Sequence, residues 1–259
     1  MVGDEKQDEL KVSSLKLKAS RKSVAVTGVV TDRDASALLW VLHQGVMTVD
    51  QLFRAVYRTS PSQSPRHAYT RIQFLEQSGF LVSLKSTHRK ERFLKITKLG
   101  QSYLLSQNIQ NVTRALSVPS TAEIPHAEIL TEIRIAIQES GKHGDSLWWQ
   151  GECLLSEDDE FPKERFRDLM PDAIWVTKSS RRVAIEFERA RKGITRVRKK
   201  VEGFELELNR PDRVFDRVLW VAVDGAYRDV KKAISNRETQ TLRTVGEFMS
   251  ELKGVENNA

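Results

Sequence analysis

Hydrophobic residues in the first half of the chain recur mainly at spacings of three and four, the period of an amphipathic helix. This pattern predicts four helices, over residues 31–45, 48–57, 64–79 and 97–106. Between the third and the fourth, the segments FLVSLK and RFLKIT predict two strands joined by a short basic turn, residues 86–90. Three helices followed by a β-hairpin predict a winged helix-turn-helix DNA-binding domain over residues 27–108, a fold that also serves for protein contacts.

In the second half of the chain, strand-like and helix-like segments are interspersed. Amphipathic helices are predicted from residue 126 (HAEILTEIRIAIQES), over the apolar stripe from Ile194 to Leu208, and over residues 227–235. Runs of β-branched and aromatic residues predict strands at 147–155, 171–176, 183–188, 214–223 and within 236–246. The order α-β-β-β-α-β-α predicts an α+β chain with a central mixed sheet in a second domain, residues 126–259.

Two polar segments flank the predicted N-terminal domain. Residues 1–26 are charged and lack periodicity, which predicts a flexible tail. Residues 109–125 are polar and contain two prolines, which predicts a linker between the domains.

Three acidic residues lie on a predicted hairpin of the second domain. Asp172 opens the strand PDAIWV, and Glu186 and Glu188 lie two residues apart on the strand VAIEFE, so both leave the same face. The short polar turn between the strands can bring Asp172 alongside Glu186. Because Mg²⁺ and Mn²⁺ bind carboxylate oxygens together with substrate phosphate, these acids are candidate metal ligands and catalytic residues.

Other roles for these acids stay open at the level of the sequence. A hairpin whose carboxylates pair with arginines is the simpler structure for the same pattern. Glu132 falls on the inner face of the helix predicted from residue 126 and is a fourth candidate ligand. Capping, or pairing with Arg134 or Arg165, accounts for Glu132 equally well.

Basic residues are concentrated beside the acids and on the predicted winged domain. Residues 189–200 hold seven basic residues and no acid. We expect Arg196, Lys199 and Lys200 to face solvent or DNA, because the opposite side of their helix is apolar. On the N-terminal domain, the candidate DNA-binding residues lie on the third helix and the hairpin: Arg66, His67, Arg71, Lys85, His88, Arg89 and Lys90.

The composition favours a polyanionic partner. The 259 residues carry a net charge of +7 and have an isoelectric point near 9.5, which fits DNA. No apolar run approaches the roughly 18 residues of a membrane span, and the acidic N-terminus is unlike a signal peptide. The single cysteine, Cys153, leaves no internal disulfide and indicates a reduced, cytoplasmic protein.

The acids on successive strands resemble the PD-(D/E)XK nuclease superfamily, whose pattern is an acid followed by acid-x-Lys. Asp172 and Glu186-Phe187-Glu188 match it, but Glu188 stands where lysine is expected. A lysine supplied from elsewhere, Lys192 or Lys199, would have to substitute. This departure weakens the case for ordinary double-strand cleavage.

The chain as a whole resembles the replication-relaxation family, over roughly residues 30–235. The resemblance rests on the predicted winged helix, on His126, Thr131 and Glu132 in one helix, and on PDA…IEFERARK. This family includes the C-class plasmid mobilisation relaxases. Membership implies binding an origin of transfer or replication and nicking one strand with Mg²⁺ or Mn²⁺.

Carried over by position, the resemblance assigns metal binding to Asp172, Glu186, Glu188 and Glu132, and charge neutralisation to Lys192 or Lys199. The nucleophile is left open between water and a tyrosine, Tyr103 or Tyr227. It also implies an accessory or coupling protein of the relaxosome as a partner. Two alternatives stand beside this hypothesis: a DNA-binding regulator or replication accessory protein with an inert second domain, and a module that docks a partner relaxase or coupling protein.

Overall fold

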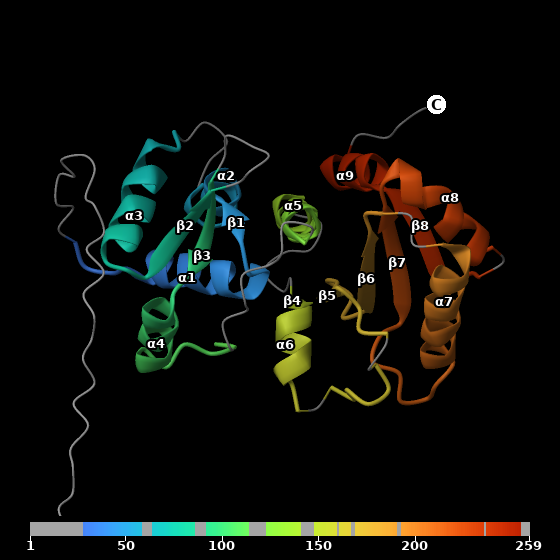
Figure 1. The fold of residues 1–259 in the computed structure, drawn as a ribbon. Coiled ribbons are helices and arrows are strands. Elements are labelled where there is room, and N and C mark those ends of the chain that lie inside the picture. Colours follow the sequence, from blue (N-terminus) through green and yellow to red (C-terminus); the bar gives the residue numbers. More distant parts are fainter. Residues whose placement is uncertain are drawn as a thin grey trace, which may run out of the picture.

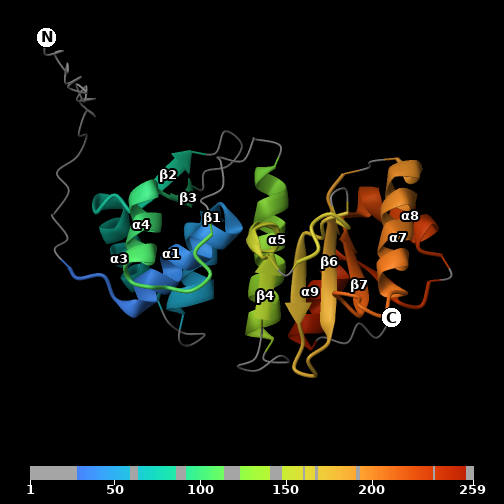
Figure 2. The same cartoon turned by 90° about the horizontal axis from the view of Figure 1, so that it is seen from below.

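Figure 1 shows the computed structural model of the chain, which describes residues 28–58, 64–85, 92–113, 123–140, 148–159, 161–166, 169–190, 193–235 and 237–254. These residues form nine α-helices, one short π-helix and two sheets, which confirms the predicted α+β class. Two halves with separate sheets lie side by side, and one helix, α5, passes between them (Figures 1 and 2). The tail predicted at residues 1–26 and the basic turn at 86–90 lie outside the described residues.

The N-terminal half is built in the predicted order, with helices first and a hairpin after them. Its elements are α1 (Asp32–Gln44), β1 (Met47–Thr48), α2 (Val49–Leu52), the π-helix η1 (Phe53–Tyr57), α3 (Arg66–Gln77), β2 (Leu81–Lys85), β3 (Arg92–Ile96) and α4 (Lys98–Ser106). The strands form an antiparallel sheet in the order β1-β3-β2. Leu38, Leu42, Ile72 and Leu75 are among the fully buried residues that pack the helices onto this sheet.

Threonine caps fix where three of these helices begin. Thr31 and Thr48 each form a capping box, with Asp34 and Gln51 as the reciprocal partners. The Thr97 hydroxyl accepts a hydrogen bond from the Gly100 backbone N–H at 3.1 Å. All three starts match the predictions from sequence.

The C-terminal half is a five-stranded mixed sheet with helices on both faces. Its elements are α5 (Ile124–Glu139), β4 (Trp148–Gly151), α6 (Glu152–Glu157), β5 (Ala173–Val176), β6 (Arg182–Glu188), α7 (Ile194–Leu208), β7 (Arg217–Ala222), α8 (Asp224–Ala233), β8 (Gln240–Thr244) and α9 (Val245–Lys253). The strand order is β4-β5-β6-β7-β8, with the first two pairings antiparallel and the last two parallel. This confirms the predicted mixed sheet.

Helices α7 and α8 cover one face of this sheet, while α5 and α9 cover the other (Figure 1). On the α7 side, Val201 and Phe204 pack against Trp220, and the rings of Phe204 and Trp220 lie 5.7 Å apart. On the α5 side, Ile133 and Ile137 pack against sheet residues that include Phe187. Successive residues of β6 therefore face different helices.

Two segments differ from the predicted elements. The prediction of one strand over residues 147–155 was wrong beyond Gly151, because the chain turns there into α6 and buries Cys153 and Leu155 on a helix. An apolar run of this length suits a buried strand and a buried helix equally. The second difference is α9, which follows β8 directly and begins with a capping box between Thr244 and Glu247. Within the described parts of the chain, every helix is too short or too polar to span a bilayer.

Candidate functional site

The hairpin of β5 and β6 brings Asp172 beside Glu186. Ala173, the first residue of β5, pairs with Ile185, so Asp172 and Glu186 lie one step beyond this pair, where β5 begins. The Oδ2 atom of Asp172 accepts a hydrogen bond from the Phe187 backbone N–H at 2.6 Å, which fixes the carboxylate against β6. The predicted approach of these two acids is therefore present.

Glu186 is buried at 1% exposure and its two oxygens have different surroundings. Its Oε1 is in an ion pair with the ammonium of Lys200, while its Oε2 is buried without a hydrogen-bond partner. Burial, followed by the nearby charge of Asp172, raises the pKa of Glu186 to about 8. The carboxyl group of Glu186 therefore gives up its proton less readily than that of an ordinary glutamate.

Lys200 enters the site from α7, on the face of the sheet that Glu186 shares. Burial alone lowers the pKa of Lys200, but the carboxylates of Glu186 and Asp172 outweigh it, so the net pKa shift is upward. Lys200 does not project freely into solvent as predicted, because its side chain is only 22% exposed and contacts Glu186; its contact with DNA stays a prediction. Its position on α7 explains the low exposure, because Lys200 lies three residues after Val197 and four before Phe204, on the buried stripe.

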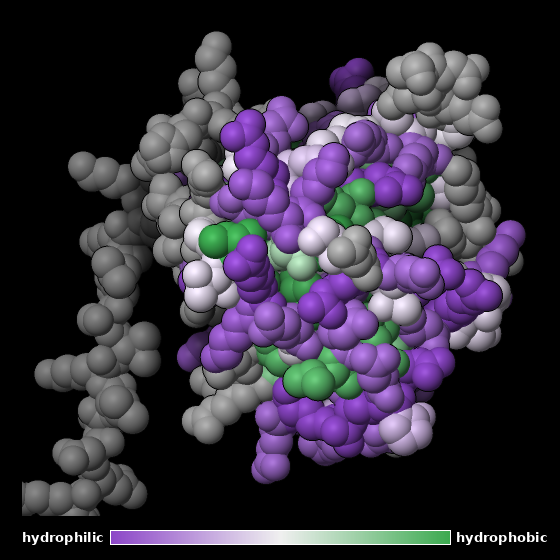
Figure 3. Space-filling view, turned by 90° about the vertical axis from the view of Figure 1, so that its right-hand side faces the viewer, coloured by the Kyte–Doolittle hydropathy of each residue, from purple (hydrophilic) through white to green (hydrophobic). Residues whose placement is uncertain are grey.

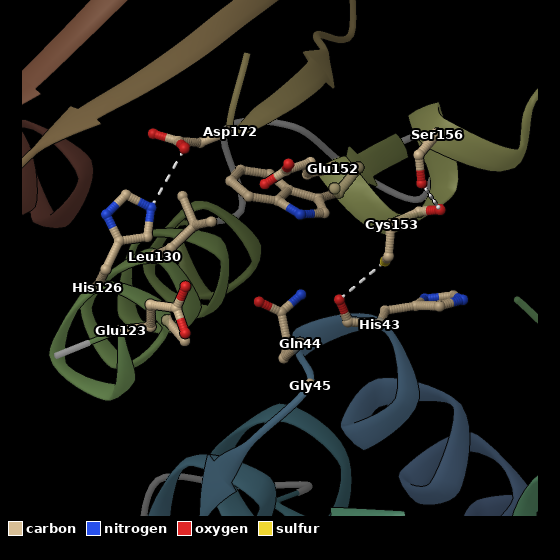
Figure 4. A pocket seen from close by; sticks show the side chains of 13 residues that line it. His43, Gln44, Gly45, Glu123, His126, Leu130, Glu152, Cys153, Ser156 and Asp172 are labelled. Atoms are coloured by element: carbon tan, nitrogen blue, oxygen red, sulfur yellow. Dashed lines mark hydrogen bonds and ion pairs between the residues drawn. The ribbon is translucent and has the colours of Figure 1, made fainter. Parts of the chain in front are cut away.

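The other oxygen of Asp172 faces a histidine from α5. The Nε2 atom of His126 lies 3.2 Å from Oδ1 of Asp172 (Figure 4). The His126 ring also packs on Phe187, with 5.1 Å between the ring centroids. Burial by itself raises the pKa of Asp172, but the hydrogen bond from His126 and the charge of Lys200 hold it below the ordinary value. Asp172 is thus the acid of the pair that stays ionised.

The remaining predicted acids occupy two different places. Glu188 is buried at 3% exposure, on the same face of β6 as Glu186, and its charge contributes to the raised pKa of Glu186. We call Asp172, Glu186, Glu188 and Lys200 the acid–lysine cluster. Glu132, by contrast, is held by the N-terminal half, where it accepts hydrogen bonds from Arg54 at 2.8 Å and Gln51 at 2.9 Å.

The structure thus separates Glu132 from the acid–lysine cluster and contradicts its assignment as a metal ligand. The alternative weighed from sequence, pairing with Arg134 or Arg165, named the wrong partners, because the arginine that Glu132 contacts is Arg54. Lys192 lies outside the described residues, so its predicted catalytic role is not placed. Lys199 is exposed on α7 and does not reach Glu186 as Lys200 does.

The donor set fits a divalent cation in type, though not as a ready-made cage. Among the described residues, no group of three or more histidine, cysteine, aspartate or glutamate side chains is arranged to hold a metal ion. The buried Oε2 of Glu186 has no partner, and Asp172 beside it is ionised. Once Glu186 is ionised, two such carboxylates suit Mg²⁺ or Mn²⁺ when water or a substrate phosphate supplies the other ligands.

The predicted DNA-binding residues of the N-terminal half divide into exposed and buried ones. Arg66 and His67 at the start of α3 are exposed, as is Lys85 at the end of β2. Arg71 is not available to read bases: its guanidinium is paired with the buried carboxylate of Asp34 and also donates to the Val29 carbonyl at 2.9 Å. The predicted residues of the basic turn, His88, Arg89 and Lys90, lie outside the described residues.

Helix α7 presents two more of the predicted DNA-binding residues on its exposed side: Arg196, one turn before Lys200, and Lys199, its neighbour in the sequence. Figure 3 looks onto the side of the molecule on which α7 and α8 lie in Figure 1, and this side is mostly hydrophilic. The exposed positions predicted for Arg196 and Lys199 are therefore present, on the helix that also supplies Lys200.

A cleft of about 480 Å³ opens beside Asp172, between the two halves of the molecule (Figure 4). We call it the interdomain cleft; it is lined by His43, Gln44, Gly45, Glu123, His126, Ala127, Leu130, Trp149, Gly151, Glu152, Cys153, Ser156 and Asp172. Partial removal from water, followed by the charge of Asp172, raises the pKa of Glu152. Glu152 and the contact between His126 and Asp172 were not predicted from the sequence, although His126 belongs to the motif that carries the family resemblance.

In comparisons with known proteins, no family model matches this chain and no curated protein matches its sequence.

Proposed function

We propose that this protein binds plasmid DNA through its N-terminal half and nicks one strand at an origin of transfer or replication with its C-terminal half. The observation that carries this proposal is the contact of Lys200 with Glu186 beside Asp172. In this proposal Lys200, on α7, would take the place of the lysine that the strand motif lacks. The arrangement supports a PD-(D/E)XK-like site of the replication-relaxation type.

The DNA-binding part of the proposal depends on interpreting the N-terminal half of the molecule as a winged helix. Helix α3 precedes the β2–β3 hairpin and presents Arg66 and His67 on its exposed side. In a winged helix this element enters the major groove, while the hairpin meets phosphate. The net charge of +7 favours the same partner.

The chemistry we propose is phosphodiester cleavage assisted by Mg²⁺ or Mn²⁺, with Asp172 and Glu186 as the protein ligands. When bound, the ion would activate an oxygen nucleophile and stabilise charge on the phosphate. Asp172 is oriented for this role by the Phe187 N–H and by His126. Lys200 offers a cation to the scissile phosphate once Glu186 is engaged elsewhere.

The cellular setting belongs to the same proposal. The composition and the single cysteine favour the cytoplasm, where plasmid DNA lies. An accessory or coupling protein of the relaxosome is the protein partner that the family resemblance implies.

The decisive experiment incubates supercoiled plasmid carrying the native origin with the wild type, Asp172→Ala and Glu186→Ala, with Mn²⁺ or with EDTA. We expect the wild type to convert supercoiled to open-circular DNA only with metal, and both variants to lose this activity. Binding of duplex origin DNA, measured by fluorescence anisotropy, should stay within about twofold. Nicking by both variants at the wild-type rate would refute the proposal.

A second function is favoured by one specific observation. Within the described residues, no group of three side chains is arranged as a metal site, and Asp172 and Glu186 already have partners in His126 and Lys200. This suits a DNA-binding regulator or accessory protein whose second half is inert. Isothermal titration with Mn²⁺ separates the two: saturable binding that Asp172→Ala abolishes excludes the inert site, and no heat at millimolar Mn²⁺ supports it.

A further inference from the structure

The interdomain cleft contains polar groups that the proposed cleavage chemistry does not use. Gln44 comes from the C-terminal end of α1, and Glu152 is the first residue of α6. Figure 4 shows Gln44 and Glu152 on opposite sides of the open space, with His126 and Asp172 at one end. Both halves of the molecule therefore contribute polar groups to one cavity that reaches the proposed site of cleavage.

The cleft contains a buried hydrogen-bond donor that lacks an acceptor. Trp149 is 6% exposed, and its indole Nε1 has no hydrogen-bond partner. An unpaired buried N–H is costly, so such groups in native proteins call for an explanation. A ligand atom that accepts a hydrogen bond would supply the missing partner.

Gly151 leaves room beside this donor. A Cβ atom at Gly151 would lie 3.7 Å from Nε1 of Trp149, 3.8 Å from the His43 carbonyl oxygen and 3.9 Å from Sγ of Cys153. These are ordinary van der Waals distances, so one atom at this point would touch the three walls without displacing them, next to the indole N–H. The Gly151 backbone, at φ −73° and ψ 170°, is open to any residue.

The charges around the cleft select the kind of ligand. Glu123, Glu152 and Asp172 line it, so an anion is disfavoured except where a metal ion or Lys200 offsets the acids. Carboxylates accept hydrogen bonds from amino groups, the Trp149 N–H donates to a carbonyl or ring nitrogen, and the Gln44 amide can do both. A flat, neutral heterocycle with an amino group and an acceptor matches this lining.

We propose that the interdomain cleft receives one nucleobase of a DNA strand, turned out of its stack, and prefers a base that carries an exocyclic amino group. The inference rests on the DNA-binding function proposed above and specifies its substrate as an unpaired strand. A base held here would lie next to Asp172, so the attached backbone would pass the acid–lysine cluster. The cavity of about 480 Å³ lies within the range of small-molecule sites and lies between two halves, where such sites commonly occur.

The test uses the full chain in EDTA, so that binding is measured without cleavage. The probes are fluorescein-labelled strands of oligo-dC, oligo-dT and an abasic strand of equal length, a duplex of mixed sequence, and the neutral nucleoside 2′-deoxycytidine observed by NMR. The variants are Gly151→Leu, which fills the cleft, and Trp149→Phe, which removes the donor and keeps an aromatic ring. Gly225→Leu is the matched control, because a Cβ at Gly225 meets nothing within 4 Å.

We expect the wild type to bind oligo-dC about tenfold more tightly than the abasic strand, and more tightly than oligo-dT. Gly151→Leu and Trp149→Phe should lose this advantage, while Gly225→Leu keeps it and all four proteins bind the duplex alike. Equal affinity for oligo-dC and the abasic strand, or an advantage that survives Gly151→Leu, would overturn the nucleobase site.

Failure of the nucleobase site and failure of DNA binding give different results. A wild type that binds the duplex but does not distinguish the strands disproves the nucleobase site alone. A wild type that binds no DNA but takes up 2′-deoxycytidine, with the signal lost in Gly151→Leu, disproves the proposed function and keeps the site. No response to any probe disproves both, and a circular dichroism spectrum that matches the wild type shows that each variant is folded.

Discussion

At the scale of single residues, Lys200 is the position at which the proposed cleavage is most sensitive to one charge. Lys200→Met keeps the length of the side chain but leaves Glu186 without the ammonium that contacts its Oε1. We expect the nicking rate to fall by about 100-fold, since removal of one preorganised electrostatic group commonly has that effect. Duplex binding, read by anisotropy, should change less than threefold.

The neighbouring residue provides the control for this substitution. Lys199 is exposed on the same helix, so Lys199→Met removes an equal charge without touching Glu186. It should weaken DNA binding slightly and leave the nicking rate at saturating DNA unchanged. Equal rates for both variants would mean that Lys200 acts only as a surface cation.

Glu186 gives the molecule a pH dependence of stability whose sign is fixed by its raised pKa. The folded chain keeps a proton up to about pH 8, whereas the unfolded chain releases it near the ordinary value of 4.5. The stabilisation from Glu186 is therefore complete below pH 4.5 and is lost as the pH rises through about 8.

In Glu186→Gln the side-chain amide cannot ionise, so this variant should not lose stability through residue 186 as the pH rises. Urea unfolding in EDTA at about pH 5 and about pH 9 should show the wild type losing stability relative to Glu186→Gln, by at most about 1.4 kcal/mol per pH unit. Parallel pH profiles for the two proteins would contradict the raised pKa.

At the scale of elements, helix α3 carries two arginines with different roles: Arg71 pairs with a buried carboxylate, and Arg66 is exposed. Asp34 is fully buried and receives hydrogen bonds from Arg71 and from the Tyr57 hydroxyl, at 3.0 Å for the latter. Arg71→Ala leaves this carboxylate without its cation and should cost about 3 kcal/mol in the free energy of unfolding. The exposed Arg66→Ala should change stability by less than about 0.5 kcal/mol but weaken duplex binding severalfold.

Urea unfolding of Arg71→Ala and Arg66→Ala measures the effect on stability, and fluorescence anisotropy measures the effect on duplex binding. Reduced DNA affinity in a fully folded Arg71→Ala, with unchanged stability, would restore the sequence-based expectation that Arg71 contacts DNA.

The positions of Arg71 and Lys200 were mispredicted for the same physical reason. Arg71 lies three residues after Ala68 and four before Leu75, and Lys200 lies in the same relation to Val197 and Phe204. Both are therefore on the buried stripe of their helix, a position that the helical period alone could have identified. They were assigned outward because cations are usually exposed, but each has a buried carboxylate from another element as its partner.

Elements with local signals were predicted well, and contacts between distant segments were not. The caps at Thr31, Thr48 and Thr97 and the hairpin of β5 and β6 are encoded within a few residues. The contact of His126 with Asp172 spans 46 residues and depends on how α5 lies against the sheet, which no local pattern specifies. Helix α9 was missed although Thr244, Glu247 and Gly254 are ordinary helix start and stop signals.

At the scale of the whole molecule, α5 makes the two halves depend on each other. Ile135 belongs to the core of the N-terminal half, whereas Ile133 and Ile137 belong to that of the C-terminal half. Polar contacts add to this packing: Arg54 pairs with Glu132 and Glu139, at 2.8 Å and 3.1 Å. A helix that completes two cores cannot unfold with only one of them, so the cleft between the halves should hold its shape in solution.

This coupling predicts that damage to the N-terminal core destabilises both halves together. Ile135 is fully buried, so Ile135→Ala should lower the free energy of unfolding by about 3 kcal/mol, while the exposed Leu206→Ala changes it by less than about 0.5 kcal/mol. Four of the five tryptophans lie in the C-terminal half, so tryptophan fluorescence reports mainly on that half and far-UV circular dichroism on the whole chain. In urea, both signals of Ile135→Ala should shift to the same lower midpoint. A fluorescence midpoint that stays at the wild-type value while the dichroism transition splits would mean that the halves unfold independently, and that the interdomain cleft is not a fixed part of the fold.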